Sequence, residues 1–380
     1  MYSGPYYRYD LERLRETLNV AIEAATKHNI VLKYAIKANN EERIVSEIKN
    51  SGIGVDCVSQ EEVAYALEQG WTAEEIVFAG SGKTIREVRY ALEQEIGYLH
   101  CESVQEFEIA KEIKASLESS TSLVLRINPD LKVDTHEKIS TGEKHHKFGM
   151  SFEEAKAIIS ENYDVVGIHL HVGSQILDMT YFEDLSLKVR GLLEQLPSDY
   201  NLKYLNLGGG LGINYENPER EPISDFNGWM AAIRKHLPVE FINEIYLEPG
   251  RSIVGQCGQL IGEVQYIKNE NTHPIAILDV GMTEILRPAL YGARHKITTS
   301  NDSLVTESYT VSGPSCESSD TFGNNFELPV IQRGDLVTIH STGAYGSSMR
   351  LSYNLRNPLP VQYVEKKRPT LLKPINYRVA

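Results

Sequence analysis

The feature that most constrains this chain is a regular alternation of short β-rich runs with amphipathic helical runs over residues 31–248. Such alternation is typical of a parallel sheet in which helices connect the strands. The predicted strands are 31–37, 53–59, 76–79, 97–101, 122–128, 165–172, 204–207 and 245–248. The predicted helices are 10–29, 41–49, 60–69, 84–93, 104–117, 151–161, 182–195 and 226–236. Eight such units fit a closed β/α barrel better than an open sheet.

The residue pattern changes after Arg251, where β-rich runs and turn residues replace the helical periodicity. The runs are 252–266, 273–280, 308–312 and 335–340. They predict a second, mainly antiparallel β domain. We therefore expect an α/β protein: a (β/α)8 barrel at residues 8–254, followed by a β domain at 255–380 that residues 1–7 join.

Charge and cysteine usage exclude several classes of protein. The formal net charge is -14, so no basic surface is expected to bind nucleic acid, and an anionic substrate needs local cations. No apolar stretch approaches the roughly 18 residues of a membrane span, and no signal peptide is recognised. The four cysteines are scattered, which argues against a disulfide scaffold or a structural zinc site and favours the cytoplasm.

Lys37 is the first candidate catalytic residue, because it stands where an apolar strand ends and a helix begins. Burial disfavours the charged amine and makes the lysine a better nucleophile. A nucleophilic amine is what a Schiff base with an aldehyde cofactor requires. A strand-end lysine with its head in solvent is the alternative for this residue taken alone.

Other polar residues and glycines gather at the predicted strand ends, where barrels carry their functional groups. They are Asp56, Ser59, Arg126, His169, His171, Ser174, Gly208, Gly209, Gly210, Glu248, Gly250 and Arg251. The three glycines suit a phosphate or a plain tight turn. Glu248 could pair with a pyridinium nitrogen, with Arg126, or with both. His171 could lie against a cofactor ring or be an ordinary core histidine, and Arg251 could hold a phosphate or a carboxylate.

Three further motifs lie in the predicted β domain. Arg287 and Tyr291 place a cation and a phenol on one short segment, Cys316 and Glu317 lie in a glycine- and serine-rich loop, and Tyr345 stands between small residues. The alternatives are a surface arginine, an inert thiol and a core tyrosine.

The long polar segment 128–148 contains His136, His145 and His146. Long loops after barrel strands are often lids or binding elements. The histidine spacing matches no ligand pattern, so we expect no metal site.

Taken in order, these motifs resemble the pyridoxal-phosphate decarboxylases built on an alanine-racemase-like barrel, and more narrowly the diaminopimelate decarboxylases. The resemblance covers nearly the whole chain. It is carried by Tyr34-Ala-Ile-Lys-Ala-Asn39, Val55-Asp-Cys-Val-Ser59, His171-Val-Gly-Ser-Gln175, Gly208-Gly-Gly-Leu-Gly212, Glu248-Pro-Gly-Arg251, Arg287-Pro-Ala-Leu-Tyr291, Cys316-Glu-Ser-Ser-Asp320 and Gly343-Ala-Tyr-Gly346.

The resemblance implies a role for most of these residues. Lys37 would bind pyridoxal 5'-phosphate, His171 would stack on its ring, and Glu248 would pair with the ring nitrogen. Residues near the phosphate or the substrate would be Ser174, Gly210, Gly250, Arg251 and Tyr345. Cys316 and Glu317 would reach the active site of the other subunit in a homodimer, with Cys316 a candidate general acid.

The implied reaction is decarboxylation of meso-2,6-diaminopimelate to L-lysine, the last step of lysine biosynthesis. Arg287, with Tyr291, would bind the distal carboxylate of the substrate, which needs a planar cation. Decarboxylation of ornithine, lysine, arginine or a carrier-bound amino acid is the alternative. A racemase is disfavoured by the Cys316 and His171 motifs. A catalytically silent cofactor-binding protein is disfavoured because Lys37, Cys316 and Glu317 are all present.

Overall fold

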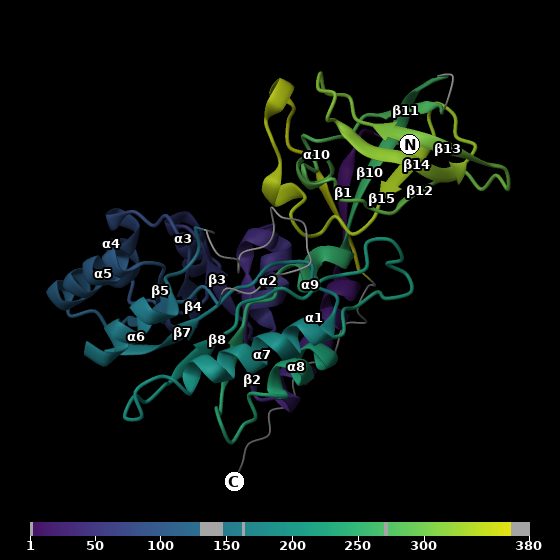
Figure 1. The fold of residues 1–380 in the computed structure, drawn as a ribbon. Coiled ribbons are helices and arrows are strands. Elements are labelled where there is room, and N and C mark those ends of the chain that lie inside the picture. Colours follow the sequence, from purple (N-terminus) through teal and green to yellow (C-terminus); the bar gives the residue numbers. More distant parts are fainter. Residues whose placement is uncertain (1–2, 130–146, 162–163, 270–272, 366–380) are drawn as a thin grey trace, which may run out of the picture.

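The structure, a computed structural model, describes residues 3–129, 147–161, 164–269 and 273–365. Eight parallel strands form a closed barrel in which the last strand pairs with the first (Figure 1). They are β2 (Ile30–Ala35), β3 (Gly54–Cys57), β4 (Ile76–Phe78), β5 (Tyr98–Cys101), β6 (Ser122–Arg126), β7 (Val165–His169), β8 (Tyr204–Asn206) and β9 (Ile245–Leu247). The predicted barrel and its eight strands are therefore confirmed.

Helices cover the outside of the barrel: α1 leads into its first strand, and the others connect successive barrel strands (Figure 1). They are α1 (Leu11–Lys27), α2 (Glu42–Asn50), α3 (Gln60–Glu68), α4 (Ile85–Glu93), α5 (Val104–Leu117), α6 (Phe152–Glu161), α7 (Met179–Leu193) and α8 (Phe226–Arg234). Several begin at side-chain caps: Ser59 accepts from the backbone N–H of Glu62, and Ser103 from that of Glu106. A cap of this kind stabilises a helix by about 1 kcal/mol. These two caps fix the turns that follow β3 and β5, at the end of the barrel where the functional side chains lie.

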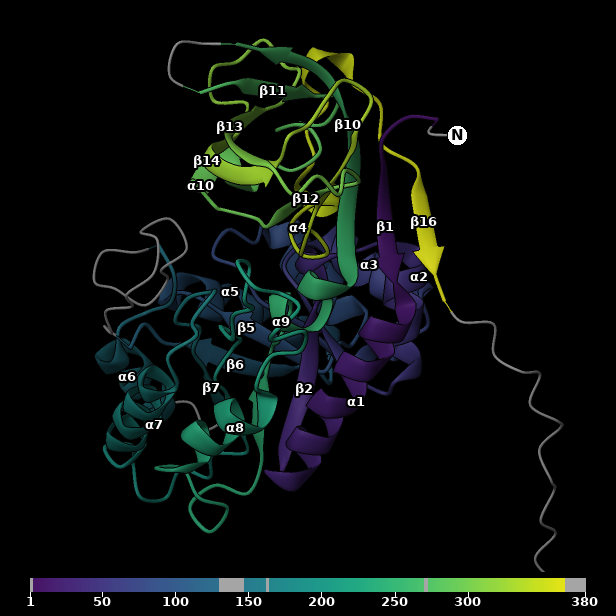
Figure 2. The same cartoon turned by 90° about the vertical axis from the view of Figure 1, so that its right-hand side faces the viewer.

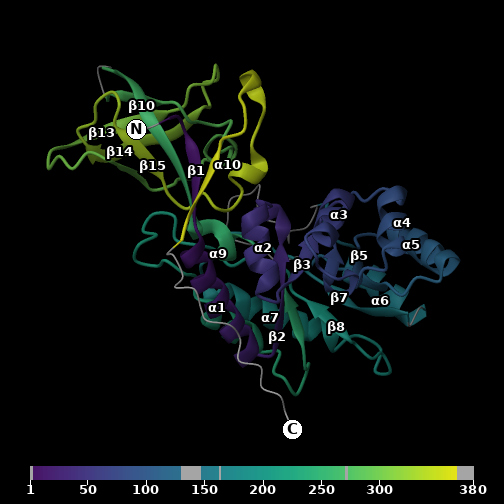
Figure 3. The ribbon, with the colours of Figure 1, turned by 180° about the vertical axis from the view of Figure 1, so that it is seen from behind.

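The strands after the barrel form a second sheet in the order β12-β15-β10-β11-β13-β14. They are β10 (Gly258–Lys268), β11 (Ile275–Leu278), β12 (Ile297–Thr299), β13 (Thr306–Ser312), β14 (Thr321–Pro329) and β15 (Leu336–Ile339). The pairing is mainly antiparallel, as predicted, although β11 and β13 run parallel. Figure 3 shows this sheet beside the barrel, with α2 and α9 near the junction.

The strand β1 (Tyr6–Asp10) precedes the barrel in the sequence but pairs with the second sheet. Tyr6 lies opposite Ile261 of β10, and on its other side β1 runs parallel to β16 (Val361–Val364), as Figure 2 shows. The chain therefore enters the barrel from the second sheet. The division into units 8–254 and 255–380 stays a prediction.

One predicted strand begins too early. The sequence predicts extended backbone over residues 252–257, but α9 (Arg251–Val254) and a 3-10 turn (Gly255–Cys257) occupy this stretch, and β10 starts at Gly258. All four α9 side chains are buried. A fully buried run as short as this has no periodicity that separates helix from strand.

The three histidines of the predicted long loop, His136, His145 and His146, lie outside the described residues.

The barrel interior is built in layers that lead from an aromatic floor to a polar mouth. The rings of Tyr98 and Tyr204 lie 4.0 Å apart, and those of Tyr204 and Tyr246 lie 4.3 Å apart. Side chains two residues further along a strand share its face. The layer above the tyrosines therefore carries His100, Asn206 and Glu248.

The described part of the chain has no helix that is both long and apolar enough to cross a bilayer.

Candidate active site

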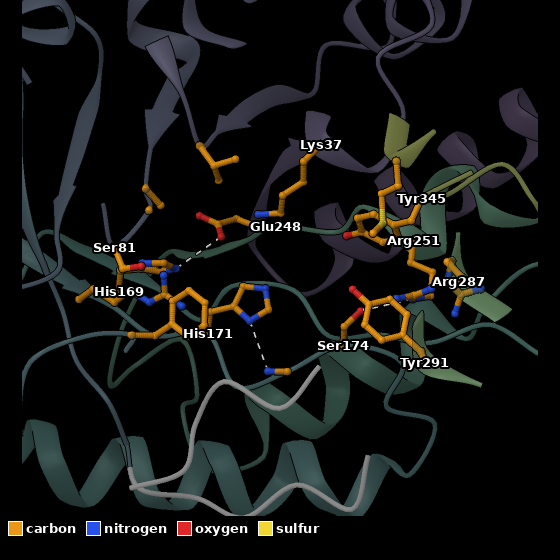
Figure 4. Close-up of a pocket in the computed structure, with 17 residues that line it drawn as sticks. Lys37, Ser81, His169, His171, Ser174, Glu248, Arg251, Arg287, Tyr291 and Tyr345 are labelled. Carbon is orange, nitrogen blue, oxygen red and sulfur yellow. Dashed lines mark hydrogen bonds and ion pairs between the residues drawn. The ribbon is translucent and has the colours of Figure 1, made fainter. Parts of the chain in front are cut away.

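A cavity of about 420 Å³ opens at the carboxyl ends of the barrel strands and extends to segments 287–291 and 345–349, which follow strands of the second sheet. It brings together nine of the predicted site residues, several of which are labelled in Figure 4. They are Lys37, Arg126, His171, Ser174, Glu248, Arg251, Arg287, Tyr291 and Tyr345. Residues from both predicted domains thus face one pocket.

Lys37 extends into this cavity from a 3-10 turn (Ile36–Ala38) that directly follows β2. Its Nζ lies 3.1 Å from Oδ2 of Asp56 at the end of β3. Burial acts to lower the pKa of Lys37, but the surrounding acidic groups, Asp56 foremost, together outweigh burial, so the pKa lies above its ordinary value. The expectation that burial leaves a readily deprotonated amine is therefore wrong for the protein without cofactor. Burial also raises the pKa of Asp56, to about 7.

Glu248 follows β9 and is the buried carboxyl group at the centre of the site. Its Oε1 accepts a hydrogen bond from Nδ2 of Asn206 at 2.6 Å. Its Oε2 lies 3.4 Å from Nε2 of His169, a close approach without hydrogen-bond geometry. Burial raises the pKa of Glu248, while the charge of Lys37 and the Asn206 hydrogen bond oppose this. The carboxyl group faces the same space as the lysine (Figure 4).

His171 lines the cavity beside the predicted glycine turn. Its Nδ1 accepts from the backbone N–H of Gly173 at 3.3 Å, and burial lowers its pKa well below the ordinary value, so the ring is neutral. A Cβ added at Gly208 would lie 2.9 Å from the Cβ of His171, and one at Gly209 would run into the Glu248 carbonyl oxygen. The glycines therefore allow three loops to meet closely.

Arg251 and Ser174 form a second polar group in the cavity. Nη2 of Arg251 donates to the Ser174 hydroxyl at 2.9 Å, and Nη1 donates to the hydroxyl of Tyr215 at 2.6 Å. The ring of Tyr345 lies 4.9 Å from the same guanidinium.

Close backbone contacts hold these groups beside Lys37. The backbone N–H of Tyr345 donates to the carbonyl of Ala38, the residue after Lys37, at 2.8 Å. A Cβ added at Gly250, which precedes Arg251, would lie only 3.0 Å from the Cβ of Ala38. A side chain at position 250 would therefore push the Arg251 segment away from the lysine turn.

Arg287 is the first residue of α10 (Arg287–Tyr291) and is buried. Among the described residues, no carboxylate forms an ion pair with it. Burial lowers the pKa of its guanidinium, and the neighbouring Arg251 acts in the same direction. A desolvated cation in a cavity with Lys37 is suited to an anionic group of a ligand.

Cys316 and Glu317 do not line this cavity in the same chain. Cys316 is an exposed free thiol, and the Glu317 carboxylate accepts from the hydroxyl of Tyr353 at 2.8 Å. Their predicted contribution to the site of a second subunit stays a prediction.

Sequence reasoning gave no role to several residues of the site. The cavity wall includes Ser81, Phe148, His169 and Met349. His169 was among the polar residues predicted at the strand ends, two residues before His171, and its position on the inward strand face was the available signal. Burial lowers its pKa well below the ordinary value.

Two buried networks were missed because their members come from separate strands. The carboxylate of Glu102 accepts from Arg126 at 2.5 Å and from the backbone N–H groups of Gly80 and Gly149. The potential ligand atoms of His100, His169 and Glu248 lie within 4.8 Å of one another. No spacing in the sequence indicates either cluster.

Comparison with known proteins gives the family. Residues 11–255 match the model of the pyridoxal-dependent decarboxylases, pyridoxal binding domain. A diaminopimelate decarboxylase from Bacteroides thetaiotaomicron is 40% identical over 366 residues, which cover 94% of this chain and 95% of the relative. The chain belongs to the diaminopimelate decarboxylases. It is a pyridoxal-phosphate-dependent carboxy-lyase, as the motifs predicted.

Solved structures of this family agree in fold. Diaminopimelate decarboxylase from Helicobacter pylori, complexed with L-lysine, superposes with a TM-score of 0.89 at 35% identity and covers 96% of this chain and 92% of its own. A lysine/ornithine decarboxylase from Vibrio vulnificus has a TM-score of 0.81 at 23% identity, covering 96% and 95%, which shows the shared fold alone.

The cavity fits pyridoxal phosphate. It offers an amine at Lys37, a buried carboxyl group at Glu248 and the cation of Arg251. The turn Gly208–Gly210 lets neighbouring loops close around these groups, because a Cβ at Gly208 or Gly209 would collide with them. These groups match the aldehyde, the ring nitrogen and the phosphate of the cofactor.

Proposed function

We propose that the protein removes carbon dioxide from meso-2,6-diaminopimelate and releases L-lysine, the last step of lysine biosynthesis. Membership of the diaminopimelate decarboxylases supports this substrate. The single observation that carries the proposal is the buried guanidinium of Arg287, which shares a cavity with Lys37 and has no acidic partner among the described residues. A substrate with an amino-acid group at each end fits both, because one end can react at the cofactor on Lys37 while the carboxylate of the other end pairs with Arg287.

The cofactor would be held by residues from four loops. Lys37 would bind it covalently, Ser174 and Arg251 would bind its phosphate beside Gly208–Gly210, and His171 would lie against its ring. The 2.9 Å hydrogen bond between Arg251 and Ser174 supports a shared anion site, because both groups point into the cavity. Asp56, Arg126, Gly250 and Tyr345 complete the proposed cofactor-binding set.

Glu248 would hold a proton at the ring nitrogen of the cofactor. When bound, pyridoxal phosphate supplies the electron sink that stabilises the carbanion left by loss of carbon dioxide. An ionised carboxylate beside a pyridine nitrogen favours the protonated ring. The hydrogen bond from Asn206 favours the ionised form of Glu248 against the effect of burial.

Arg287, assisted by Tyr291, would bind the distal carboxylate and so set the substrate specificity. Arg251 and Tyr345 also line the space available to the substrate. A planar guanidinium binds a carboxylate through two parallel hydrogen bonds and resists an ammonium group. Ornithine and lysine, whose distal group is an ammonium, are therefore poorer substrates in this proposal.

A homodimer with shared active sites would supply the remaining groups. Cys316 would act as general acid, or the freed Lys37 would, and Glu317 would bind the substrate of the other subunit. Exposure of Cys316 supports this, because the thiol is accessible and does not face its own cavity. The described cysteines are all free thiols, which also supports a cytoplasmic location.

A panel of amino acids tests the reaction. Carbon dioxide release from diaminopimelate should exceed that from ornithine, lysine and arginine, the substrates of the alternative function. A preference for any of these three over diaminopimelate would replace the proposal by that alternative.

Arg287→Ala tests the substrate assignment. A desolvated charge pair is worth roughly 2–5 kcal/mol, so kcat/KM for diaminopimelate should fall by at least about 30-fold. Arg294→Ala is the matched control, because Arg294 lies a few residues away and contacts Phe326 outside the cavity. Unchanged kcat/KM in a folded, cofactor-loaded Arg287→Ala enzyme would show that Arg287 does not bind the substrate.

A further inference from the structure

The position of Arg287 depends on two neighbours that carry no charge. Its Nη1 lies 2.8 Å from Nε2 of His295, and its guanidinium carbon lies 4.5 Å above the ring of Tyr215. Arginine is a flexible side chain, and fixing it before a ligand arrives reduces the entropy lost on binding. These contacts therefore matter for recognition as well as for packing.

The tautomer of His295 follows from its second contact. Its Nδ1 lies 2.9 Å from the backbone carbonyl oxygen of His340, which can only accept. Nδ1 must therefore carry the proton, which leaves Nε2 with a lone pair to accept from Arg287. Burial, together with the charge of Arg287, lowers the pKa of His295 to about 3, so the ring stays neutral.

Tyr215 links this pair to the other cation of the site. Its ring lies edge-on to His295 at 4.8 Å, its face is covered by Arg287, and its hydroxyl accepts from Arg251. One aromatic ring thus touches both guanidinium groups. Arg287 is confined by a face contact and a directed hydrogen bond, and no other described residue accepts from its remaining N–H groups, which leaves them for a ligand.

We propose that His295 is a positioning residue that orients Arg287 toward the distal carboxylate of the substrate, acting as a neutral hydrogen-bond acceptor. The inference rests on the proposed function, because it needs a substrate with that carboxylate. His295 does not line the cavity, so its effect passes through Arg287.

Two substitutions remove the acceptor in different ways. The amide of His295→Asn can still reach the His340 carbonyl but is too short to reach Arg287, whereas His295→Phe keeps a ring and removes both hydrogen bonds. His295→Gln is the conservative variant, since its amide oxygen can reach Arg287. Thr298→Val is the matched control: it removes a 2.8 Å hydrogen bond to the His340 side chain in the same region and leaves Arg287 untouched.

The measurements are KM and kcat for diaminopimelate and the inhibition constants of L-lysine and cadaverine on the cofactor-loaded enzyme. L-lysine retains the distal carboxylate after the reaction, and cadaverine lacks it. His295→Asn and His295→Phe should raise KM and the lysine constant by about tenfold or more, with a smaller change in kcat. The cadaverine constant should stay the same, and His295→Gln should recover most of the loss.

Three results would overturn the inference: a lysine constant within about twofold of wild type in both loss variants, an equal loss of cadaverine binding, or no recovery in His295→Gln. Melting temperature and cofactor absorbance identify a misfolded variant, and either loss variant that folds decides the question. Failure of the proposed function is separate, because wild-type enzyme would then not act on diaminopimelate and would not bind lysine.

Discussion

Replacing Asn206 should show how much the buried hydrogen bonds around Glu248 contribute to the stability of the protein. Its side chain is fully buried and makes three hydrogen bonds: to Glu248 at 2.6 Å, to the Tyr204 hydroxyl at 2.7 Å, and from the Gly208 backbone at 2.8 Å. Asn206→Leu keeps the branching at Cγ and removes all three.

The loss can be estimated bond by bond. A hydrogen bond to a charged group is worth about 1.5–3 kcal/mol, and a buried N–H left without an acceptor at Gly208 costs about 1–3 kcal/mol. Tyr204 keeps its 3.1 Å contact with His100. The free energy of unfolding should therefore fall by roughly 3–5 kcal/mol. The pKa of Glu248 should also rise further, because the Asn206 hydrogen bond opposes the effect of burial.

Urea unfolding of the cofactor-free protein measures this directly. Asn227→Ala is the control, because Asn227 is an exposed partner of Lys27 and its loss should change stability by less than about 0.5 kcal/mol. A decrease below about 1 kcal/mol for Asn206→Leu would refute the reasoning, since it would mean that the three hydrogen bonds contribute little.

Two further predictions concern the cofactor site. Burial raises the pKa of Asp56 to about 7 from 3.8, so its contribution to stability is full below pH 3.8 and is lost as the pH rises through 7. Asp56→Asn should therefore raise the melting temperature of the cofactor-free protein at pH 8, and the difference from wild type should vanish near pH 4; a constant difference would contradict this. Gly209→Ala should weaken cofactor binding by about tenfold or more in an absorbance titration, because its Cβ would collide with the Glu248 carbonyl, whereas Gly191→Ala, with open space around it, should have no effect.

The barrel could be predicted from the sequence because its two kinds of element carry different signals. Parallel strands are buried on both sides and appear as short apolar runs, while the covering helices keep an amphipathic period. The helix Val104–Leu117 was predicted to the residue. Lys37, Arg126 and Glu248 were found for a related reason, since each is a charged residue at the end of an apolar run.

The rest of the site depends on contacts between distant segments. Nothing around His295 indicates that it meets Arg287. The acidic groups that gather around Lys37, of which Asp56 at 3.1 Å contributes most, together reverse the expected direction of the lysine pKa. The strands β12, β14 and β16 were missed as well. In β16 most residues are exposed, so it has little apolar signal.

The pairing of β1 with β10 and β16 has a consequence for how the molecule is made. During synthesis β1 leaves the ribosome long before β10 and β16 are made, so this strand stays unpaired while the barrel segments emerge. Assembly of the second sheet is then a late step that ties the start of the chain to its final strands. Truncated chains that end after the barrel would leave the backbone hydrogen-bonding groups of β1 unpaired and should be prone to aggregate.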